Sequence, residues 1–409
     1  MTSKSSEALA LLSARAVRER TGRLFALGEA GGLDHFMLDL TAMPALARRV
    51  AEVTRAAYPK LDVPFHARWR HFVHRGEDRW ATLATRTRWV TPTDRARAAF
   101  DLAITSVLLD AGAGSTWRYR DPVTGDAVGR SEGLALASFD MFAGGAFSAD
   151  PADPLRADAG RLVALSVTDI VQGFQVSPEN PLEGLEGRVA LLNALGRMLI
   201  AHDAPRDGHG AARPGALFDV LTGSRSVVVA PAILGAVLRH LGGIWPSRLT
   251  FDGVPLGDCW RHPRLDNGTP GSDLVPFHKL SQWLSYSLIE PMQAAGITVT
   301  DIGGLTGLAE YRNGGLFLDG GVIVPKNPKI LDCLQAPGST VVVEWRALTV
   351  QLLDRIAPLV RTELGVSEAE FPLAKVLEGG TWAAGRVLAR ERRADGGPPL
   401  RIVSDGTVF

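Results

Sequence analysis

The sequence predicts a mainly α-helical protein with a few short strands. Apolar residues recur with helical spacing over several long segments, and capping residues mark the ends of these segments. Strands and helices do not alternate regularly, as they would in a doubly wound sheet. The chain has 409 residues, of which 46% are apolar and 22% charged, and this composition is typical of a globular protein. We therefore expect a packed hydrophobic core.

The first half of the chain shows the clearest helical periodicity. Phe100, Ile104, Val107 and Leu108 follow the spacing i, i+4, i+7 and i+8 within residues 93–110. Turn residues between the helical segments predict a hairpin or loop over residues 117–130. Further helices are predicted over residues 44–57, 132–141, 168–174 and 185–201.

A glycine-rich segment without periodicity, residues 204–215, predicts a loop or hinge. We expect it to separate an N-terminal helical lobe, residues 1–203, from a C-terminal lobe, residues 216–409. The second half is predicted to contain short strands over residues 316–324 and 340–345. Its helices are predicted over residues 231–241, 274–294, 306–312 and 348–364, with further helices after a capping-box pattern at residues 367–370.

Charge and cysteine content exclude several classes of protein. The chain has 44 basic and 44 acidic side chains, whereas coating nucleic acid or an anionic membrane requires a cationic surplus. The longest apolar run, residues 227–238, is shorter than the roughly 20 residues that span a bilayer. Two cysteines cannot build a disulfide framework, and the first residues do not resemble a signal peptide. We expect a cytoplasmic protein that binds a small molecule.

Common catalytic and metal-binding motifs are missing from the sequence. It has no Gly-x-Ser-x-Gly elbow, no phosphate-binding Gly-x-x-x-x-Gly-Lys-Ser/Thr loop, no His-Glu-x-x-His and no Cys-x-x-Cys. His66, His71 and His74 are close in sequence, but on a helix the first two would lie about 140° apart. We expect no metal and no cofactor. The interleaved Arg68, Trp69 and Arg70 form either an anion-binding or base-stacking surface, or a helix packed by its aromatic residues with solvated arginines.

Two segments place charged residues among apolar and aromatic ones. Lys279 and Trp283 are four residues apart on a predicted helix, where they share a face. Glu310 precedes Tyr311 and a Gly-Gly pair, which predicts a position near a helix end where its ionisation can be tuned. Spacing alone favours a structural Lys279–Glu310 salt bridge over a catalytic pair.

The sequence resembles a known family over nearly its whole length, from about residue 17 to residue 386. The resemblance is to the uracil catabolism protein 4 family of fungal and bacterial proteins. It is carried by residues 69–72 (Trp-Arg-His-Phe), 106–114 (Ser-Val-Leu-Leu-Asp-Ala-Gly-Ala-Gly), 130–135 (Arg-Ser-Glu-Gly-Leu-Ala), 213–215 (Arg-Pro-Gly) and 305–315.

More distantly, the order of elements resembles the queuosine salvage nucleosidases. Their helical body implies a DNA-glycosylase-like fold, with two lobes around a pocket between Lys279, Glu310 and residues 110–117. In those enzymes a lysine and an aspartate about thirty residues later form the reacting pair. The matching residues here are Lys279 and Glu310, 31 residues apart, and glutamate in place of aspartate lengthens the reach by one methylene. Residues 132–147 and 166–169 resemble the helix and acidic turn that close over the base.

The resemblance implies a substrate and a mechanism. The family name implies a route that opens the uracil ring while ribose is still attached, leaving ribosylurea or its 5'-phosphate. A carboxylate would stabilise the oxocarbenium-like transition state of N-ribosidic cleavage, so Glu310 and Lys279 are the expected catalytic residues. Asp110, Glu132 and Trp117 are expected near the urea, and Arg225 or Arg312 near a phosphate. The full set of expected substrate-binding residues is Asp110, Trp117, Glu132, Trp283, Tyr311, Arg225 and Arg312.

These observations predict a metal-independent hydrolase that releases urea from ribosylurea or its 5'-phosphate. One alternative is a hydrolase of an intact modified nucleoside or nucleotide. A second alternative is a non-catalytic nucleotide-binding protein that keeps the same pocket.

Overall fold

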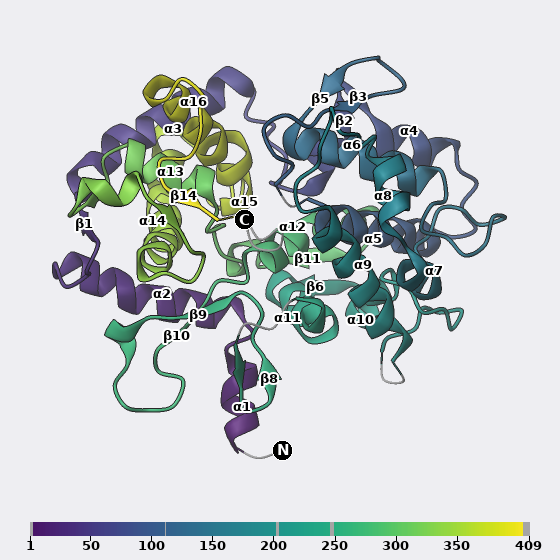
Figure 1. Cartoon of the computed structure of the whole chain (residues 1–409), viewed down its shortest axis with the longest axis horizontal. Helices are drawn as coiled ribbons and strands as arrows, with labels where there is room; N and C mark the ends of the chain where they lie inside the picture. Colours follow the sequence, from purple (N-terminus) through teal and green to yellow (C-terminus); the bar gives the residue numbers. More distant parts are fainter. Residues whose placement is uncertain (1–2, 111, 202–203, 246–248, 404–409) are drawn as a thin grey trace. The chain divides into compact units, whose positions relative to one another are not determined.

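The computed structural model describes residues 3–110, 112–201, 204–245 and 249–403. Helices dominate and the strands are short, so the predicted mainly α fold class is confirmed (Figure 1). None of the helices in these ranges is both long and apolar enough to cross a membrane.

The chain folds into two compact units that each combine distant segments. Within the described ranges, unit 1 consists of residues 3–66, 249–282 and 301–403, and unit 2 of residues 67–245 and 283–300. The loop 204–215, where the sequence places a lobe boundary, lies within unit 2.

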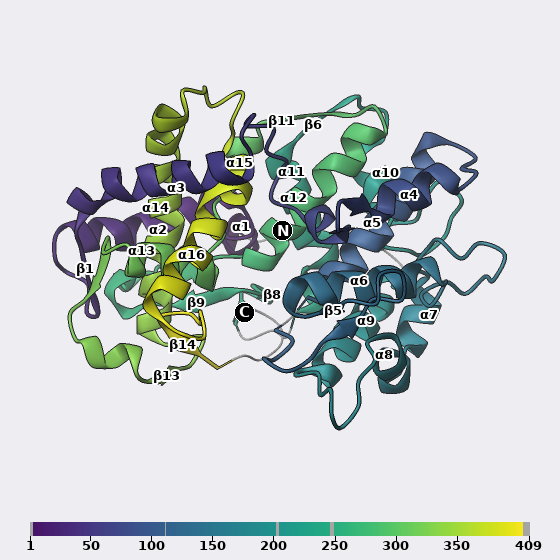
Figure 2. The ribbon, with the colours of Figure 1, turned by 90° about the horizontal axis from the view of Figure 1, so that it is seen from above.

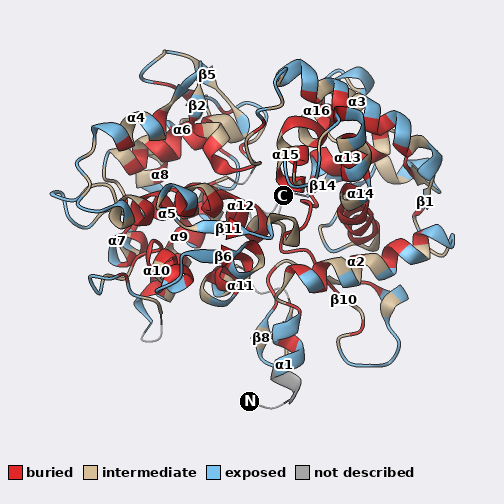
Figure 3. Ribbon diagram, turned by 180° about the vertical axis from the view of Figure 1, so that it is seen from behind, coloured by how far each residue is buried: buried red, intermediate tan, exposed pale blue. Residues whose placement is uncertain are grey.

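Unit 1 is built around the 25-residue helix α14, which packs on α2 and α3. Most residues of α14 are buried (Figure 3). Figure 2 shows α2, α3 and α14 side by side. The helices of unit 1 are α1 (Ser3–Ala10), α2 (Ala14–Glu29), α3 (Met43–Ala57), α13 (Tyr311–Asp319), α14 (Thr340–Leu364), α15 (Leu373–Val376) and α16 (Trp382–Arg392). The first turn of α12 (Lys279–Ala294) also belongs to this unit.

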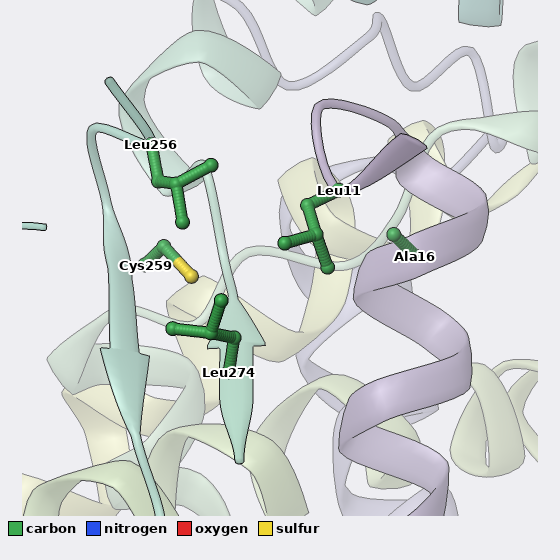
Figure 4. Close-up of a cluster of buried hydrophobic side chains, with 5 residues drawn as sticks. All are labelled: Leu11, Ala16, Leu256, Cys259 and Leu274. Carbon is green, nitrogen blue, oxygen red and sulfur yellow. The ribbon is translucent and has the colours of Figure 1, made fainter. Parts of the chain in front are cut away.

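Short two-stranded pairs connect the helices of unit 1. The antiparallel pairs are β1 (Phe36–Leu38) with β12 (Ile323–Pro325), β7 (Thr250–Phe251) with β8 (Val254–Pro255), and β9 (Cys259–Arg261) with β10 (Leu274–Pro276). A parallel pair joins β13 (Leu334–Gln335) to β14 (Arg401–Ile402). Beside β9 and β10, a small apolar cluster packs them against the start of α2; it consists of Leu11, Ala16, Leu256, Cys259 and Leu274 (Figure 4).

Unit 2 surrounds helix α5, which is buried at every residue from Ala96 to Leu108 and packs against α6, α9 and α10. The helices are α4 (Arg79–Arg86), α5 (Pro92–Leu108), α6 (Arg130–Ala143), α7 (Ala159–Ala164), α8 (Val167–Gly173), α9 (Leu185–Ile200), α10 (Ala216–Thr222) and α11 (Ala230–Leu241), with the rest of α12. The strand pairs are β2 (Val73–His74) with β3 (Glu77–Asp78), β4 (Tyr119–Arg120) with β5 (Ala127–Val128), and β6 (Val227–Val229) with β11 (Thr298–Thr300).

The Arg-Pro-Gly motif at residues 213–215 has a structural role in unit 2. Asp101 of α5 is fully buried and accepts hydrogen bonds from the Arg213 side chain (Nε, 2.9 Å), the Gly215 amide (2.6 Å) and the Ala157 amide (3.0 Å). One buried carboxylate therefore joins α5 to two loops, and its charge is compensated by a single arginine.

Four sequence predictions in unit 1 are wrong in whole or in part. The strand predicted over residues 340–345 belongs to α14, because Ser339 caps a helix whose valines are buried on all sides. The helix predicted over residues 306–312 instead begins at Tyr311 and continues through the Gly-Gly pair to Asp319, so only Ile323–Pro325 of the predicted strand 316–324 is extended. Residues 274–276 form β10 before α12 begins at Lys279.

The glycines of α13 are inside the helix because its neighbours approach closely. A Cβ atom on Gly314 would lie 2.6 Å from the Trp345 ring, whose Nε1 donates a hydrogen bond to the Gly314 carbonyl (3.1 Å). A side chain here would force α13 and α14 apart, which explains why a residue that usually ends helices is found inside one.

Gly314→Ala is therefore expected to destabilise the protein by about 1–3 kcal/mol, the usual cost of overpacking a core. Gly22→Ala is the matched control in unit 1, because a Cβ on Gly22 of α2 meets its nearest atom at an ordinary 3.7 Å. That control is expected to be neutral, or to gain up to about 1 kcal/mol from helix propensity. Urea denaturation of both variants measures whether the free energy of unfolding falls in Gly314→Ala and stays equal or rises in Gly22→Ala. Equal stability of Gly314→Ala and wild type would disprove the packing argument.

Candidate functional site

Glu310 lies at the N-terminus of α13 in unit 1, where its carboxylate caps the helix. Its two carboxylate oxygens accept hydrogen bonds from the Arg312 amide (2.7 Å) and the Asn313 amide (2.5 Å). The residue is only 7% exposed. Because both amides belong to the first turn of a helix, they hold the carboxylate in place and partly balance its charge.

Burial raises the pKa of Glu310 above its ordinary value of 4.5, against the opposing effects of the Arg312 amide, Lys279, the Asn313 amide and His66. A buried carboxylate whose pKa is raised by burial is typical of a catalytic base. Lys279 and Glu310 both belong to unit 1, and the charge of Lys279 acts on the Glu310 carboxylate. Their joint role in catalysis stays a prediction.

Asp258 and Arg346 fix the backbone around both residues. Asp258 accepts a hydrogen bond from the Lys279 amide (3.0 Å), and the Arg346 guanidinium binds its two carboxylate oxygens at 2.8 and 2.7 Å. The same guanidinium donates from Nε to the carbonyl of Ala309 (3.3 Å), directly before Glu310. Arg346 therefore connects the segment that carries Lys279 to the segment that carries Glu310.

The charge of Asp258 depends on this pairing. Burial by itself raises the pKa of Asp258, but the charge and hydrogen bonds of Arg346 and the Lys279 amide outweigh burial and lower it well below 3.8. Arg346 is 1% exposed, and its guanidinium carbon lies 4.1 Å from the centre of the Phe277 ring. The ion pair is thus bidentate, with Arg346 buried and Asp258 partly buried, and in this geometry the arginine fixes the orientation of the carboxylate.

The residue before Lys279 has an unusual backbone conformation. His278 has a φ of 49°, in the left-handed region that residues other than glycine seldom adopt. Its side chain is 2% exposed, and Nε2 lies 2.9 Å from the carbonyl of Leu11. This conformation turns the chain from β10 into α12 and sets where Lys279 begins the helix.

A π-helical turn, η7 (Leu377–Thr381), supplies a further part of the unit 1 site. Glu378 of this turn lies 2.7 Å from Nδ1 of His66. Thr381 donates to the Asn313 side-chain oxygen at 2.9 Å, and the Asn313 amide is one of the two that bind Glu310. Single π turns inside α-helices are frequent at functional sites.

In unit 2, three of the predicted binding residues gather around Arg68. Asp110 accepts from Arg68 Nη1 (2.6 Å) and from the Ser131 hydroxyl (3.0 Å), and the Arg68 guanidinium carbon lies 5.7 Å from the Trp283 ring centre. The charge of Glu132 also acts on Arg68. Arg68 is fully buried, so the interpretation with solvated arginines does not hold for Arg68, whereas an anion-binding or base-stacking surface at this segment stays a prediction. Contact of Asp110, Glu132 and Trp283 with a substrate stays a prediction.

Other predicted binding residues have partners of their own. Trp117 is fully buried in the core of unit 2, where its Nε1 donates to the Phe174 carbonyl (3.0 Å), so we do not include it in the proposed site. Arg312 is buried and donates to the Gly396 carbonyl (2.8 Å), whereas Tyr311 is 37% exposed. Arg225 is exposed and 3.5 Å from the Leu221 carbonyl, and β6 separates it from the start of α11. A phosphate role for either arginine stays a prediction.

The histidines at 66, 71 and 74 are divided between the two units. His66 is part of unit 1, whereas His71 and His74 are part of unit 2. Within the described part of the chain, no group of three or more His, Cys, Asp or Glu side chains has the arrangement of a metal site. The predicted acidic turn at residues 166–169 is a capping box for α8, in which Ser166 and Asp169 exchange hydrogen bonds.

Sequence analysis did not identify Asp258, Arg346 or Glu378, and it considered His66 only as a metal ligand. Arg346 carries a signal that could have been used, because it is a charged residue within the apolar run 341–350, the same criterion that singled out Lys279. Its partner Asp258 is 88 residues away, so spacing alone does not reveal the pair.

The fold and the site together define a class of protein. It is mainly helical and has a buried glutamate at a helix N-terminus, on which a lysine and a histidine act electrostatically. The chain belongs to the family described as "Protein of unknown function (DUF1688)", whose model matches residues 10–409. It is 37% identical to "Protein urg3" of Schizosaccharomyces pombe over 98% of each chain. It is 36% identical to "Uracil catabolism protein 4" of Lachancea kluyveri over 97% of this chain and 98% of that protein. These matches confirm the resemblance found in the sequence.

Proposed function

We propose that this protein hydrolyses the N-ribosidic bond of ribosylurea or its 5'-phosphate and releases urea in uracil catabolism. The observation that carries the proposal is the buried Glu310 carboxylate, which is held by two amides and on which the charge of Lys279 acts. The name of one relative, Uracil catabolism protein 4, supports a role in uracil catabolism. A DNA-glycosylase-like arrangement of two lobes around a pocket is part of the same proposal.

In the proposed reaction, Glu310 does two things. Its negative charge stabilises the oxocarbenium character that develops at the anomeric carbon, and the same carboxylate accepts a proton from the attacking water. Lys279 binds the ribose hydroxyls or the phosphate. The Arg346–Asp258 pair keeps both side chains in position, so that little reorganisation is needed when charge develops.

Purified protein incubated with ribosylurea, its 5'-phosphate and uridine monophosphate, with assays for free urea and free base, tests the proposal. Release of urea from a ribosylated urea supports it. Release of uracil from the nucleotide with no release of urea would instead identify a hydrolase of intact nucleotides. Tight binding without any product would identify a binding protein.

The pH dependence follows from the position of Glu310. Because burial raises its pKa and the ionised form is the active one, kcat/KM for ribosylurea is expected to rise with pH, with the midpoint of the acid limb above pH 4.5. Initial rates between pH 4 and pH 8 measure this limb. A midpoint at or below pH 4.5 would show that another group controls it.

A further inference from the structure

The His66–Glu378 pair of unit 1 is largely buried. Further contacts, besides the hydrogen bond between the two side chains, hold His66 in place. His66 Nδ1 and Glu378 Oε2 are 2.7 Å apart, and their side chains are 8% and 14% exposed. The His66 amide donates to the Ala374 carbonyl of α15 (3.0 Å), and the Trp382 ring of α16 lies 6.1 Å from the imidazole. Backbone, carboxylate and aromatic ring together fix the orientation of this imidazole.

The π-helical turn η7 explains why the carboxylate lies where it does. Gly379 and Gly380 let the turn pack against α3, since a Cβ on Gly380 would lie 2.6 Å from the Val50 side chain. On this turn Glu378 binds His66, and Thr381 binds Asn313, whose amide binds Glu310. One irregular turn therefore supports the imidazole and the Glu310 carboxylate at the same time.

The charged groups around His66 match a proton-transfer site. Glu378 contacts the imidazole from η7, and His66 lowers the pKa of Glu310, which extends from the N-terminus of α13. Lys279 of α12 acts on the same carboxylate. A carboxylate bound at Nδ1 fixes the orientation of the imidazole and directs Nε2 away from itself, as in catalytic histidine–carboxylate pairs.

We propose that His66 is the general acid of the reaction and that Glu378 is its positioning residue. This inference rests on the proposed function. As the C1'–N bond breaks, the imidazolium gives its Nε2 proton to the leaving nitrogen, and the electron pair of the broken bond becomes that of the new N–H bond. Water adds to C1' and gives its proton to Glu310. The products are urea and ribose, and solvent returns the proton from Glu310 to His66.

A substrate whose leaving group needs no proton separates this role from a structural one. On ribosylurea, His66→Gln is expected to lower kcat/KM about a hundredfold or more, within the usual range for loss of a general acid. On 4-nitrophenyl β-D-ribofuranoside, whose nitrophenolate leaves unprotonated, the same variant is expected to lose at most about threefold. Glu310→Gln is expected to lose activity on both substrates. Equal losses for His66→Gln on the two substrates, or none on ribosylurea, would overturn the proposal.

The pH profile of kcat/KM on ribosylurea is a second test of His66 as the general acid. It is the deciding test if wild type does not cleave the aryl riboside. Wild-type kcat/KM is expected to fall at high pH as the imidazolium loses its proton, and His66→Gln to lose this alkaline limb. Glu378→Gln is expected to lose about tenfold on ribosylurea and little on the aryl riboside, because the acceptor that orients the imidazole is gone. An unchanged alkaline limb in His66→Gln would overturn the proposal.

His74→Gln is the matched control. His74 forms a similar histidine–carboxylate pair with Asp126 (2.8 Å) in unit 2, and its loss is expected to leave both substrates and both limbs unchanged. Failure of the underlying function is distinguishable, because wild type would then release no urea at all, and the assignment of His66 would fall with it. Urea release by wild type with unaltered His66→Gln kinetics would reject only the assignment of His66.

Discussion

Glu310→Gln is expected to lower the turnover of ribosylurea at least about a hundredfold, the usual loss when a well-aimed electrostatic group is removed. The amide keeps the shape and one acceptor for the α13 cap, but it has no charge for the oxocarbenium and accepts no proton from water. Stability at neutral pH is expected to change by no more than about 1 kcal/mol, the typical value of a helix cap.

The small effect on stability follows from the sign of the Glu310 pKa shift. A carboxyl whose pKa is raised in the folded state stabilises the protein below the pKa of the unfolded chain, and this contribution is lost as the pH rises through the folded-state pKa. At neutral pH the charge of Glu310 therefore does not stabilise the folded state. Replacing Glu310 with the neutral glutamine removes no stabilising charge.

Steady-state kinetics and urea denaturation of Glu310→Gln measure both quantities. Asp78→Asn is the matched control, because it also changes a helix-capping carboxylate to an amide, at the start of α4 in unit 2. We expect Asp78→Asn to keep wild-type turnover. Wild-type turnover in Glu310→Gln would make this glutamate a helix cap and nothing more.

Arg346→Ala is expected to destabilise the protein by about 3 kcal/mol, the lower end of the range for breaking a buried ion pair, because it leaves the partly buried Asp258 without its cation. It also removes the bond to the Ala309 carbonyl, so the Lys279 and Glu310 segments lose their connection. We therefore expect a lower kcat for ribosylurea even under conditions where the variant is folded.

The acid sensitivity of wild type follows from the same pair. Since Arg346 lowers the Asp258 pKa below 3.8, the pair contributes its full stability above that pH and loses it as the pH falls towards the folded-state pKa. Urea denaturation at neutral and acid pH measures the effect. Arg23→Ala, which removes a half-exposed pair with Glu19, is the control and is expected to cost less than about 1 kcal/mol. A similarly small loss in Arg346→Ala would contradict the positioning role of the pair.

Much of the fold could be predicted from the sequence because local signals and burial agree there. The apolar pattern predicts a helix over residues 93–110, and α5 (Pro92–Leu108) differs from it by two residues or fewer at each end. In the structure Thr91 caps this helix and Pro92 is its first residue. The valines at 341–343 favour a strand by local propensity. They are helical because the packing of α14 on α2 and α3 outweighs that preference.

The candidate site was predictable only where its residues follow a local pattern. Lys279 and Glu310 could be singled out as charged residues in apolar segments, and both lie in unit 1, where the charge of Lys279 acts on Glu310. Their supporting residues could not be found in this way, because His66 and Glu378 are 312 residues apart in the chain. Spacing within a helix or strand carries no information about such pairs, whose meeting depends on tertiary packing.

Ribosylurea labelled with carbon-13 at the urea carbonyl and at C1 of the ribose tests the central claim most directly. Carbon NMR follows the reaction of the unphosphorylated and 5'-phosphorylated forms with wild type and with Glu310→Gln. We predict that the carbonyl label appears in free urea and the C1 label in free ribose or ribose 5-phosphate, at a rate at least about a hundredfold lower in Glu310→Gln. Carbonyl label in carbonate, which requires cleavage within the urea group, or no change in either signal, would contradict the claim.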